Sequence, residues 1–284
     1  MRHSISIYKT RSNITNALSR RQIQVHQAHN ADNTGGDRQH QARHFISPFC
    51  GACNIESAIV HTDKLCNDKN AYIIRMWQEL QQGREFPSTV TEERYKYVRD
   101  HKDEDPALTG FIGAGCSYAG KWFHGYARDR QGKNYADQAK RGKETTMSGR
   151  IYRNFAREAK DSNEHIMQAG LKHAVFTAGD YRDVEIPPDT VMYCDPPYAN
   201  THGYDGAKGF NSAEFWAYMD ELLDRTPNLS IFVSEQTAPS GWREVWQKEC
   251  LQEIKKNPKN TGRRRIERLF YKSNREGQDG HIKT

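Results

Sequence analysis

The eight residues Val191-Met192-Tyr193-Cys194-Asp195-Pro196-Pro197-Tyr198 decide the fold. The four residues before the acid form a short apolar run, which is typical of a buried strand. Because prolines cannot donate to a sheet ladder, this strand has to end near Asp195. Open α/β sheets bind ligands at the carboxyl ends of their strands, so we expect Asp195 to lie at a ligand-binding edge.

The two prolines after Asp195 stiffen the backbone beside its carboxylate. A flat base that bears an amino group would stack on the Tyr198 ring and donate hydrogen bonds to the Asp195 carboxylate and the Pro196 carbonyl, since both groups only accept. The alternative interpretation is a strand that ends in a Pro-Pro turn and leaves Tyr198 exposed without a function.

Residues 44–83 predict a second unit of strand, turn, helix and strand. A strand that begins at His44 runs into a turn at Gly51, and a helix is expected to begin within 55–60. A strand over 63–68 ends in Asp68, and the amphipathic residues 70–82 predict a helix. In nucleotide-binding sheets a glycine lets the backbone approach the ligand and an acid binds ribose hydroxyls, although a single glycine is a weak signal.

The remaining elements follow from periodicity, capping residues and glycines. They are a helix at 92–101, a glycine- and aromatic-rich segment at 107–128, a helix at 150–169, a strand at 174–178 before Asp180 and Tyr181, a glycine-rich loop at 199–210, a helix at 212–224 with Ser212 as its N-cap, a strand at 229–234 that ends at Glu235, and two strands at 250–255 and 266–272 joined by a basic loop at 256–265. Within the glycine-rich segment we expect residues 110–119 to be packed in the core, and the polar residues 121–141 are the candidate for contact with nucleic acid.

The positive charge of the chain is local. The net charge is +6, and residues 1–44 hold seven basic and two acidic residues, whereas the other 240 residues hold 35 basic and 34 acidic ones. Nine basic and three acidic residues fall within 117–153, and six basic and no acidic residues fall within 255–265. Basic clusters on a nearly neutral body predict a surface that binds a polyanion, and solvated surface loops are the alternative.

Composition excludes several classes of protein. The mean hydropathy is −0.95, and no apolar run approaches the roughly 18 residues of a membrane span. The first residues contain no apolar segment of a secretory signal, so we expect a cytoplasmic protein. The six cysteines are Cys50, Cys53, Cys66, Cys116, Cys194 and Cys250. Cys50 and Cys53 have the spacing of a zinc-binding pair, but no second pair follows, so we expect reduced thiols and no metal.

These motifs together resemble the Dam-type, D12 class DNA adenine-N6 methyltransferases, most of all their phage and prophage branch. The resemblance covers residues 45–273 and rests on the order of five segments. They are Pro-Phe-x-Gly at 48–51, Asn-Asp-x-Asn at 67–70, the acid-aromatic pair Asp180-Tyr181, Asp-Pro-Pro-Tyr at 195–198, and a basic hairpin at 259–265.

The resemblance implies a fold and a division of the chain. The fold is α/β and Rossmann-like, with a mainly parallel sheet, a C-terminal antiparallel hairpin and an inserted target-recognition region. Residues 44–83 and 171–275 are expected to form the catalytic domain, 84–170 the target-recognition region, and 1–43 and 276–284 the tails, the first of them disordered or atypical.

The resemblance also implies an activity and a set of site residues. The activity is methyl transfer from S-adenosylmethionine to N6 of an adenine flipped out of double-stranded DNA, by a protein that acts as a monomer. The catalytic residues are Asp195, Pro196, Pro197 and Tyr198. The cofactor-binding residues are Pro48, Phe49, Gly51, Asp68, Asp180, Tyr181 and Asp195. The DNA-binding residues are Lys121, Arg128, Arg130, Lys133, Lys259, Arg263, Arg264 and Arg265.

Two departures from the family pattern fall on the cofactor site. The Tyr-x-Gly-Ser-Lys-like segment that usually opens the family is absent from residues 1–43, and Ser47 stands where an acid usually precedes Pro-Phe. The alternatives are therefore a catalytically silent DNA-binding homologue with a defective cofactor site, or an N-methyltransferase that acts on an RNA base or an amide. The amide chemistry favours Asn in place of Asp195.

Overall fold

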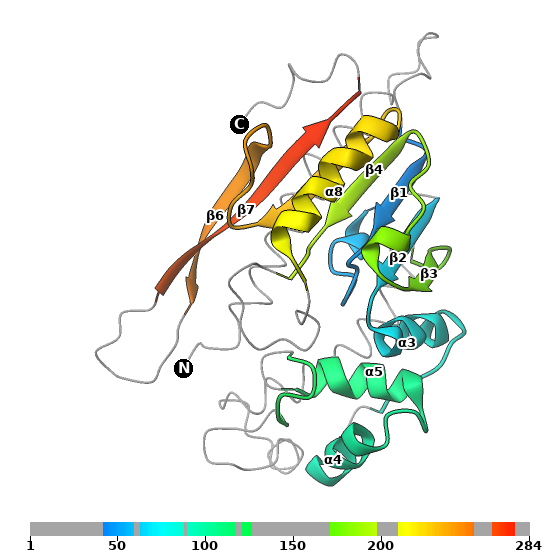
Figure 1. Cartoon of the computed structure of the whole chain (residues 1–284). Helices are drawn as coiled ribbons and strands as arrows, with labels where there is room; N and C mark the ends of the chain where they lie inside the picture. The colour runs from blue at the N-terminus through cyan, green and yellow to red at the C-terminus, as the bar shows by residue number, and fades with distance from the viewer. Residues whose placement is uncertain are drawn as a thin grey trace.

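Seven strands form one sheet in the order β3-β2-β1-β4-β5-β7-β6 (Figure 1). The computed structural model describes residues 42–59, 63–87, 90–117, 121–126, 171–197, 210–252 and 263–275. The strands are β1 (His44–Ser47), β2 (Lys64–Asp68), β3 (Val175–Ala178), β4 (Thr190–Cys194), β5 (Ser230–Glu235), β6 (Arg243–Gln252) and β7 (Arg263–Ser273). The helical elements are η2 (Glu56–Ala58), α3 (Ala71–Gln81), α4 (Glu92–Asp100), α5 (Pro106–Gly115), η4 (Tyr181–Asp183) and α8 (Ser212–Arg225).

The expected fold class is confirmed. The five strands from β3 to β5 are parallel, while β7 is antiparallel to β5 and to β6. Because β1 pairs with β2 on one side and with β4 on the other, the chain reverses its direction across the sheet at β1. Such a switch point is where doubly wound sheets open a crevice for a ligand.

Side chains of the central strands alternate between the two faces of the sheet. Met192 and Ile231 lie on the face that α8 covers with Phe215, Met219 and Leu222, as Figure 1 shows for the helix. Phe45, Val191, Tyr193 and Phe232 lie on the other face, where Ile55 and Ile59 pack against them. Residues 191–194 are all buried, as expected for a central strand covered on both faces.

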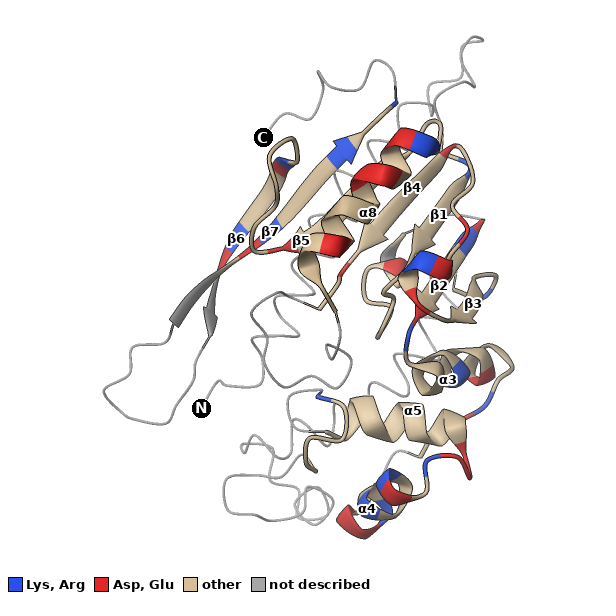
Figure 2. Ribbon diagram, in the orientation of Figure 1, with Lys and Arg blue, Asp and Glu red and all other residues tan. Residues whose placement is uncertain are grey.

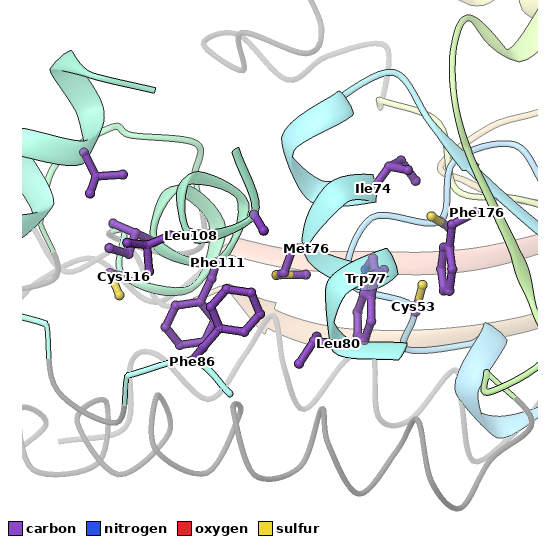
Figure 3. Close-up of a cluster of buried hydrophobic side chains, with 14 of the residues drawn as sticks. Cys53, Ile74, Met76, Trp77, Leu80, Phe86, Leu108, Phe111, Cys116 and Phe176 are labelled. Atoms are coloured by element: carbon purple, nitrogen blue, oxygen red, sulfur yellow. The ribbon is translucent and has the colours of Figure 1, made fainter. Parts of the chain in front are cut away.

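The helices α3, α5 and α4 extend away from the β2 and β3 side of the sheet (Figure 1). Figure 3 shows the buried side chains between them, and Phe86 stacks on Phe111 with ring centroids 4.9 Å apart. On the side of the sheet, Trp77 of α3 stacks on Phe176 of β3. Helix α5 carries no charged residue, in contrast to α4 and α8 (Figure 2), because it is buried between α3 and α4.

Several expected boundaries are wrong. The helix expected within 55–60 is the single 3-10 turn η2, since the backbone of Ile59 is already extended. The Lys64 ammonium donates to the carbonyls of Glu56 and Ile59 at the end of this turn. Asn211, not Ser212, caps α8, and its side chain accepts from the amides of Ala213 and Glu214.

The structure also differs from the sequence-based expectations at α5 and at the two C-terminal strands. The glycine-rich segment contains helix α5, which the sequence did not predict; Asp105 caps it and Pro106 starts it. Strand β6 begins at Arg243, and residues 263–265 belong to β7, not to the loop before it. The helix expected at 150–169 and nearly all of the loop at 199–210 lie outside the described residues.

Gly110 permits the close contact of α5 with α3, and we expect Gly110→Ala to destabilise the protein. A Cβ atom at this position would lie 2.1 Å from the carbonyl oxygen of Tyr72, so one helix would have to shift. Overpacking of this kind costs about 1–3 kcal/mol or more, measurable by urea denaturation. Gly179→Ala is the control, since its Cβ would meet only Asn67 Oδ1 at 3.8 Å. Equal stability of the two variants would contradict this packing.

Candidate active site

Four acidic or hydroxyl side chains lie at the carboxyl ends of adjacent parallel strands. Asp180 follows β3, Asp68 ends β2, Ser47 ends β1 and Asp195 follows β4. Since these strands are parallel, their ends share one edge of the sheet. Asp68 and Asp195 are therefore on the same edge, on either side of β1.

The turn at Gly51 is held by polar contacts from β2 and α3. Gly51 has φ +45°, its amide donates to Asp68 Oδ2 at 2.9 Å, and its carbonyl accepts from Trp77 Nε1 at 2.8 Å. The other Asp68 oxygen accepts the Asn70 amide at 2.8 Å. Burial raises the pKa of the Asp68 carboxyl, and the two amides oppose this rise. A carboxylate has about four lone-pair positions, so Asp68 can still accept from a ligand hydroxyl.

Asn67 ties three strand ends together, a role that the sequence analysis did not assign to it. Its Nδ2 donates to the carbonyls of Pro48 at 3.1 Å and Gly179 at 3.0 Å, and its Oδ1 accepts from Thr177 Oγ1 at 3.0 Å. In the sequence, an amide residue directly before the acid that ends a predicted strand is the signal that could have identified it. The contacts fix the backbone of Pro48, which the sequence analysis placed at the cofactor site.

Aromatic rings gather beside this turn. The centroid of Phe49 lies 5.2 Å from that of Tyr181 and 6.2 Å from that of Phe210. Phe215 of α8 completes the cluster at 5.7 Å from Tyr181. Phe210 was not among the expected site residues, since it stands at the end of a loop whose fold the sequence does not predict. The cluster forms an apolar wall next to the ends of β1 and β3.

Asp180 is engaged by neighbouring cations. Its carboxylate accepts from Arg182 Nε at 2.8 Å, and Lys69 Nζ lies 3.7 Å from Oδ2. The Arg182 contact holds the pKa of the Asp180 carboxyl below its ordinary value. A ligand amine that binds Asp180 would have to share the carboxylate with Arg182.

The Asp-Pro-Pro segment lies where the central strand ends. Asp195 is partly buried and Pro196 is buried. The negative charge of Asp195 adds to the burial that raises the pKa of the neighbouring Cys194 thiol. Tyr198 lies outside the described residues.

Glu56 brings a further carboxyl group to this edge, and the sequence analysis did not predict it. The residue is 2% exposed, and its Oε1 accepts a hydrogen bond of 2.6 Å from Ser47 Oγ. Burial raises the pKa of the Glu56 carboxyl to about 7; the Ser47 hydrogen bond opposes this rise and the charge of Asp195 adds to it. An acid between Ile55 and Ile59, which both pack on the sheet, is the sequence signal for such a group.

Part of the expected DNA-binding set can be placed. Lys121 is partly buried in segment 121–126, whose Trp122 stacks on Tyr72 of α3. The backbone of Arg263, Arg264 and Arg265 pairs with residues 250–252 of β6. Arg268 is the first residue along β7 that pairs with β5, opposite Glu235, so residues 263–267 extend past the carboxyl end of β5. Arg128, Arg130, Lys133 and Lys259 lie outside the described residues.

The cysteines form no metal centre within the described ranges. Cys50, Cys53 and Cys66 are all buried thiols, and burial raises the pKa of the Cys50 thiol to about 12. In the part of the chain that the structure describes, no three His, Cys, Asp or Glu side chains are placed to hold a metal ion, and no helix is long and apolar enough to cross a membrane.

The buried charge of Glu56 has a measurable effect on stability. The folded-state pKa of about 7 lies above the ordinary 4.5, so the folded protein binds a proton that the unfolded chain releases between these pH values. The free energy of unfolding therefore falls as the pH rises from 4.5 to about 7, stays at the lower value above pH 7, and is unaffected by Glu56 below pH 4.5.

We expect Glu56→Gln, which keeps an acceptor for Ser47 but carries no charge, to gain stability relative to wild type as the pH rises. From pH 4.5 to 8 the difference in the free energy of unfolding should grow by about 3 kcal/mol, measured by denaturant titration at each pH. The exposed Glu185→Gln serves as the control. A difference between Glu56→Gln and wild type that does not change with pH would refute the assignment.

The comparisons with known proteins identify the family of this chain. No curated protein matches the chain. Among the solved structures that are similar to the chain is SMU.472, a protein assigned as a methyltransferase, in complex with SAH. It has 10% sequence identity and a TM-score of 0.31, and the match covers 82% of this chain and 48% of that one, so the chain spans about half of its length.

A family model gives the decisive match. The model of the D12 class N6 adenine-specific DNA methyltransferases matches residues 36–228. This range is more than half of the 284 residues. The chain therefore belongs to the D12 class of N6 adenine-specific DNA methyltransferases.

Proposed function

We propose that this chain transfers a methyl group from S-adenosylmethionine to N6 of adenine in double-stranded DNA. One observation carries the proposal: in a D12 class chain, Asp68, Asp180 and the Asp195-Pro196-Pro197 segment lie at the same edge of a parallel sheet, next to the Phe49 and Tyr181 rings. Open α/β sheets bind ligands at this edge.

The side chains at the ends of β1, β2 and β3 fit the cofactor chemically. The free lone pairs of Asp68 suit ribose hydroxyls, the apolar wall of Phe49 and Tyr181 suits a purine ring, and Asp180 suits the adenine amine. Pro48 and Gly51 belong to the turn that would bring the backbone close to the cofactor. When bound, S-adenosylmethionine supplies a methyl group activated by a sulfonium.

The end of β4 would hold the target base. We assign Asp195 and the Pro196 carbonyl as acceptors for the N6 amine, Pro197 as the residue that stiffens the segment, and Tyr198 as the ring on which the base stacks. The base has to leave the duplex to reach this segment. The contribution of these residues is orientation and placement of charge, since the methyl group is already activated.

DNA would contact basic residues at the same edge. The ribbon of β6 and β7 extends past the carboxyl end of β5, and its end carries Arg263–Arg265 and leads into the loop with Lys259. Lys121, Arg128, Arg130 and Lys133 would add contacts from residues 84–170, which we assign to target recognition. Residues 44–83 and 171–275 would form the catalytic domain of a monomer. Placement in the phage and prophage branch rests on the sequence motifs alone.

We expect Asp195→Ala to abolish methyl transfer and Asp195→Asn to leave a small residual rate. Asn keeps one carbonyl acceptor without the charge, whereas Ala leaves the amine without a partner. Loss of one charge-assisted hydrogen bond lowers the rate about ten- to more than a hundred-fold. The measurement is methyl incorporation into DNA per folded molecule.

Binding of the two variants to unmodified DNA serves as the control, since Asp195 faces the reacting amine and not the phosphates. Near wild-type turnover by folded Asp195→Ala protein would eliminate the catalytic assignment and leave the turn-forming interpretation. A wild-type chain that binds DNA but not the cofactor, and methylates neither DNA nor RNA, would favour the silent homologue.

Replacing Arg263, Arg264 and Arg265 by Gln should weaken binding to all DNA sequences alike. Each lost phosphate contact reduces the slope of log affinity against log salt by about 0.9, so the slope should fall by up to roughly 2.7. The control is Arg43→Gln with Arg225→Gln, two largely exposed arginines near the opposite ends of the strands. An unchanged salt slope in the triple variant removes the hairpin from the interface.

A further inference from the structure

Glu56 is a buried ionisable group that the proposed reaction does not use. Its carboxyl group is held by Ser47 Oγ at 2.6 Å, and Ser47 itself is fully buried at the end of β1. Ser47 stands where the family pattern has an acid, and its hydroxyl instead holds a carboxyl group from nine residues further along the chain. The edge of the sheet at β1 therefore has a carboxyl group, supplied from η2.

The charged groups around Glu56 leave it without an ion-pair partner among the described residues. Asp195 follows β4, the strand that pairs with β1, and its charge raises the pKa of the Glu56 carboxyl, whereas the charge of Lys64 on β2 lowers it. The buried Cys50 thiol lies in the turn after β1. The Lys64 ammonium donates to the backbone carbonyls of Glu56 and Ile59, at 2.7 and 2.6 Å, and forms no ion pair with the Glu56 carboxylate. Glu56 and Asp195 thus put two negative charges near each other at the switch point of the sheet.

Two neighbouring carboxylates attract a cation, because a positive charge between them relieves the repulsion that each imposes on the other. The ligand of the proposed function is cationic: S-adenosylmethionine carries an ammonium and a sulfonium. Its demethylated product, S-adenosylhomocysteine, keeps the ammonium and the carboxylate but not the sulfonium, and 5′-methylthioadenosine, which lacks the amino-acid part, has neither cation.

We propose that Glu56 is a positioning residue whose buried carboxylate, together with Asp195, draws a cationic group of the cofactor to the carboxyl ends of β1 and β4. This inference rests on the proposed function, because it names the charge that the same site recognises. Glu56 acts through its field across Ser47 and not by contact, since its side chain is enclosed. A unit charge that acts without contact inside a protein changes affinity about 5- to 30-fold.

The protonation of Glu56 supports the proposal and provides a second readout. The raised pKa of its carboxyl, about 7, means that the group changes charge near neutral pH. A cationic ligand that prefers the ionised form should bind more tightly as the pH rises from 5.5 to 8. An uncharged ligand that shares the adenosine and thioether parts, such as 5′-methylthioadenosine, should not show this dependence.

The test is calorimetric binding of the three ligands to wild type and to Glu56→Gln at pH 8. We expect Glu56→Gln to weaken S-adenosylmethionine about 5- to 30-fold and to leave 5′-methylthioadenosine unchanged. Equal weakening of S-adenosylhomocysteine identifies the ammonium as the recognised group, and unchanged binding of that ligand identifies the sulfonium. Either result supports the proposal.

The double variant Ser47→Asp with Glu56→Gln returns a carboxylate to the end of β1 at the adjacent position. It should recover most of the lost affinity for S-adenosylmethionine, which a purely structural role of Glu56 does not predict. Should Glu56→Gln fail to fold, wild type decides alone: the ratio of its affinities for S-adenosylmethionine and 5′-methylthioadenosine should rise with pH.

The outcomes that overturn the inference are distinct from those that overturn the function. Equal weakening of all three ligands, no weakening of any, or a pH-independent affinity ratio in wild type refutes the role of Glu56 while the methyltransferase stands. A wild-type chain that binds none of the three ligands overturns the proposed function and, with it, this inference.

Discussion

The parallel pairing of β1 between β2 and β4 is the constraint on which the rest of the structure depends. It puts the ends of segments that lie far apart in the sequence, 47–51, 67–70 and 195–197, on one edge of the sheet. Parallel strands need crossover connections, so neither pairing is local, and each has to be maintained by side chains on both faces. The burial of Phe45 and Val191 on one face and Met192 on the other meets that need. Any weakening of this pairing would separate Asp68 from Asp195.

The hydrophobic core brings the ends of the strands near each other, and polar contacts then fix their positions. Asp68 binds the Gly51 turn and the start of α3 with one carboxylate, and Asn67 links the backbone after β1 to the backbone after β3. A left-handed backbone at Gly51 costs little because glycine has no Cβ. The turn is therefore rigid before any ligand arrives, and a site organised in advance loses less entropy on binding.

The sequence was sufficient for the parallel strands and for most of the edge formed by their carboxyl ends, but not for the bounds of β6 and β7. The Asp-Pro-Pro segment predicted where β4 ends, because proline cannot continue a ladder, and periodicity predicted α3 and α8 nearly to the residue. It was insufficient where tertiary contacts overrule local preference. The buried Lys64 ammonium binds the carbonyls of Glu56 and Ile59 at the single turn η2, and Gly110 is accommodated in a helix because α3 lies against it. Glu56 and Phe210 were missed because the turn and the loop that place them have no periodic pattern.

At Glu56, the requirements of folding stability and of ligand recognition differ. A buried carboxyl group beside another acid, with the nearby lysine bound to carbonyls, opposes folding at neutral pH. A neutral side chain that accepts the Ser47 hydroxyl would satisfy the same space without that penalty. Proteins retain such local conflicts mainly where a ligand resolves them, because stability is given up at sites that have to recognise charge. The conflict lies at the switch point of the sheet, between the two strands whose ends would hold the cofactor and the base. A cation bound there would remove it, so the folded chain would reach its lowest free energy only with its ligand in place.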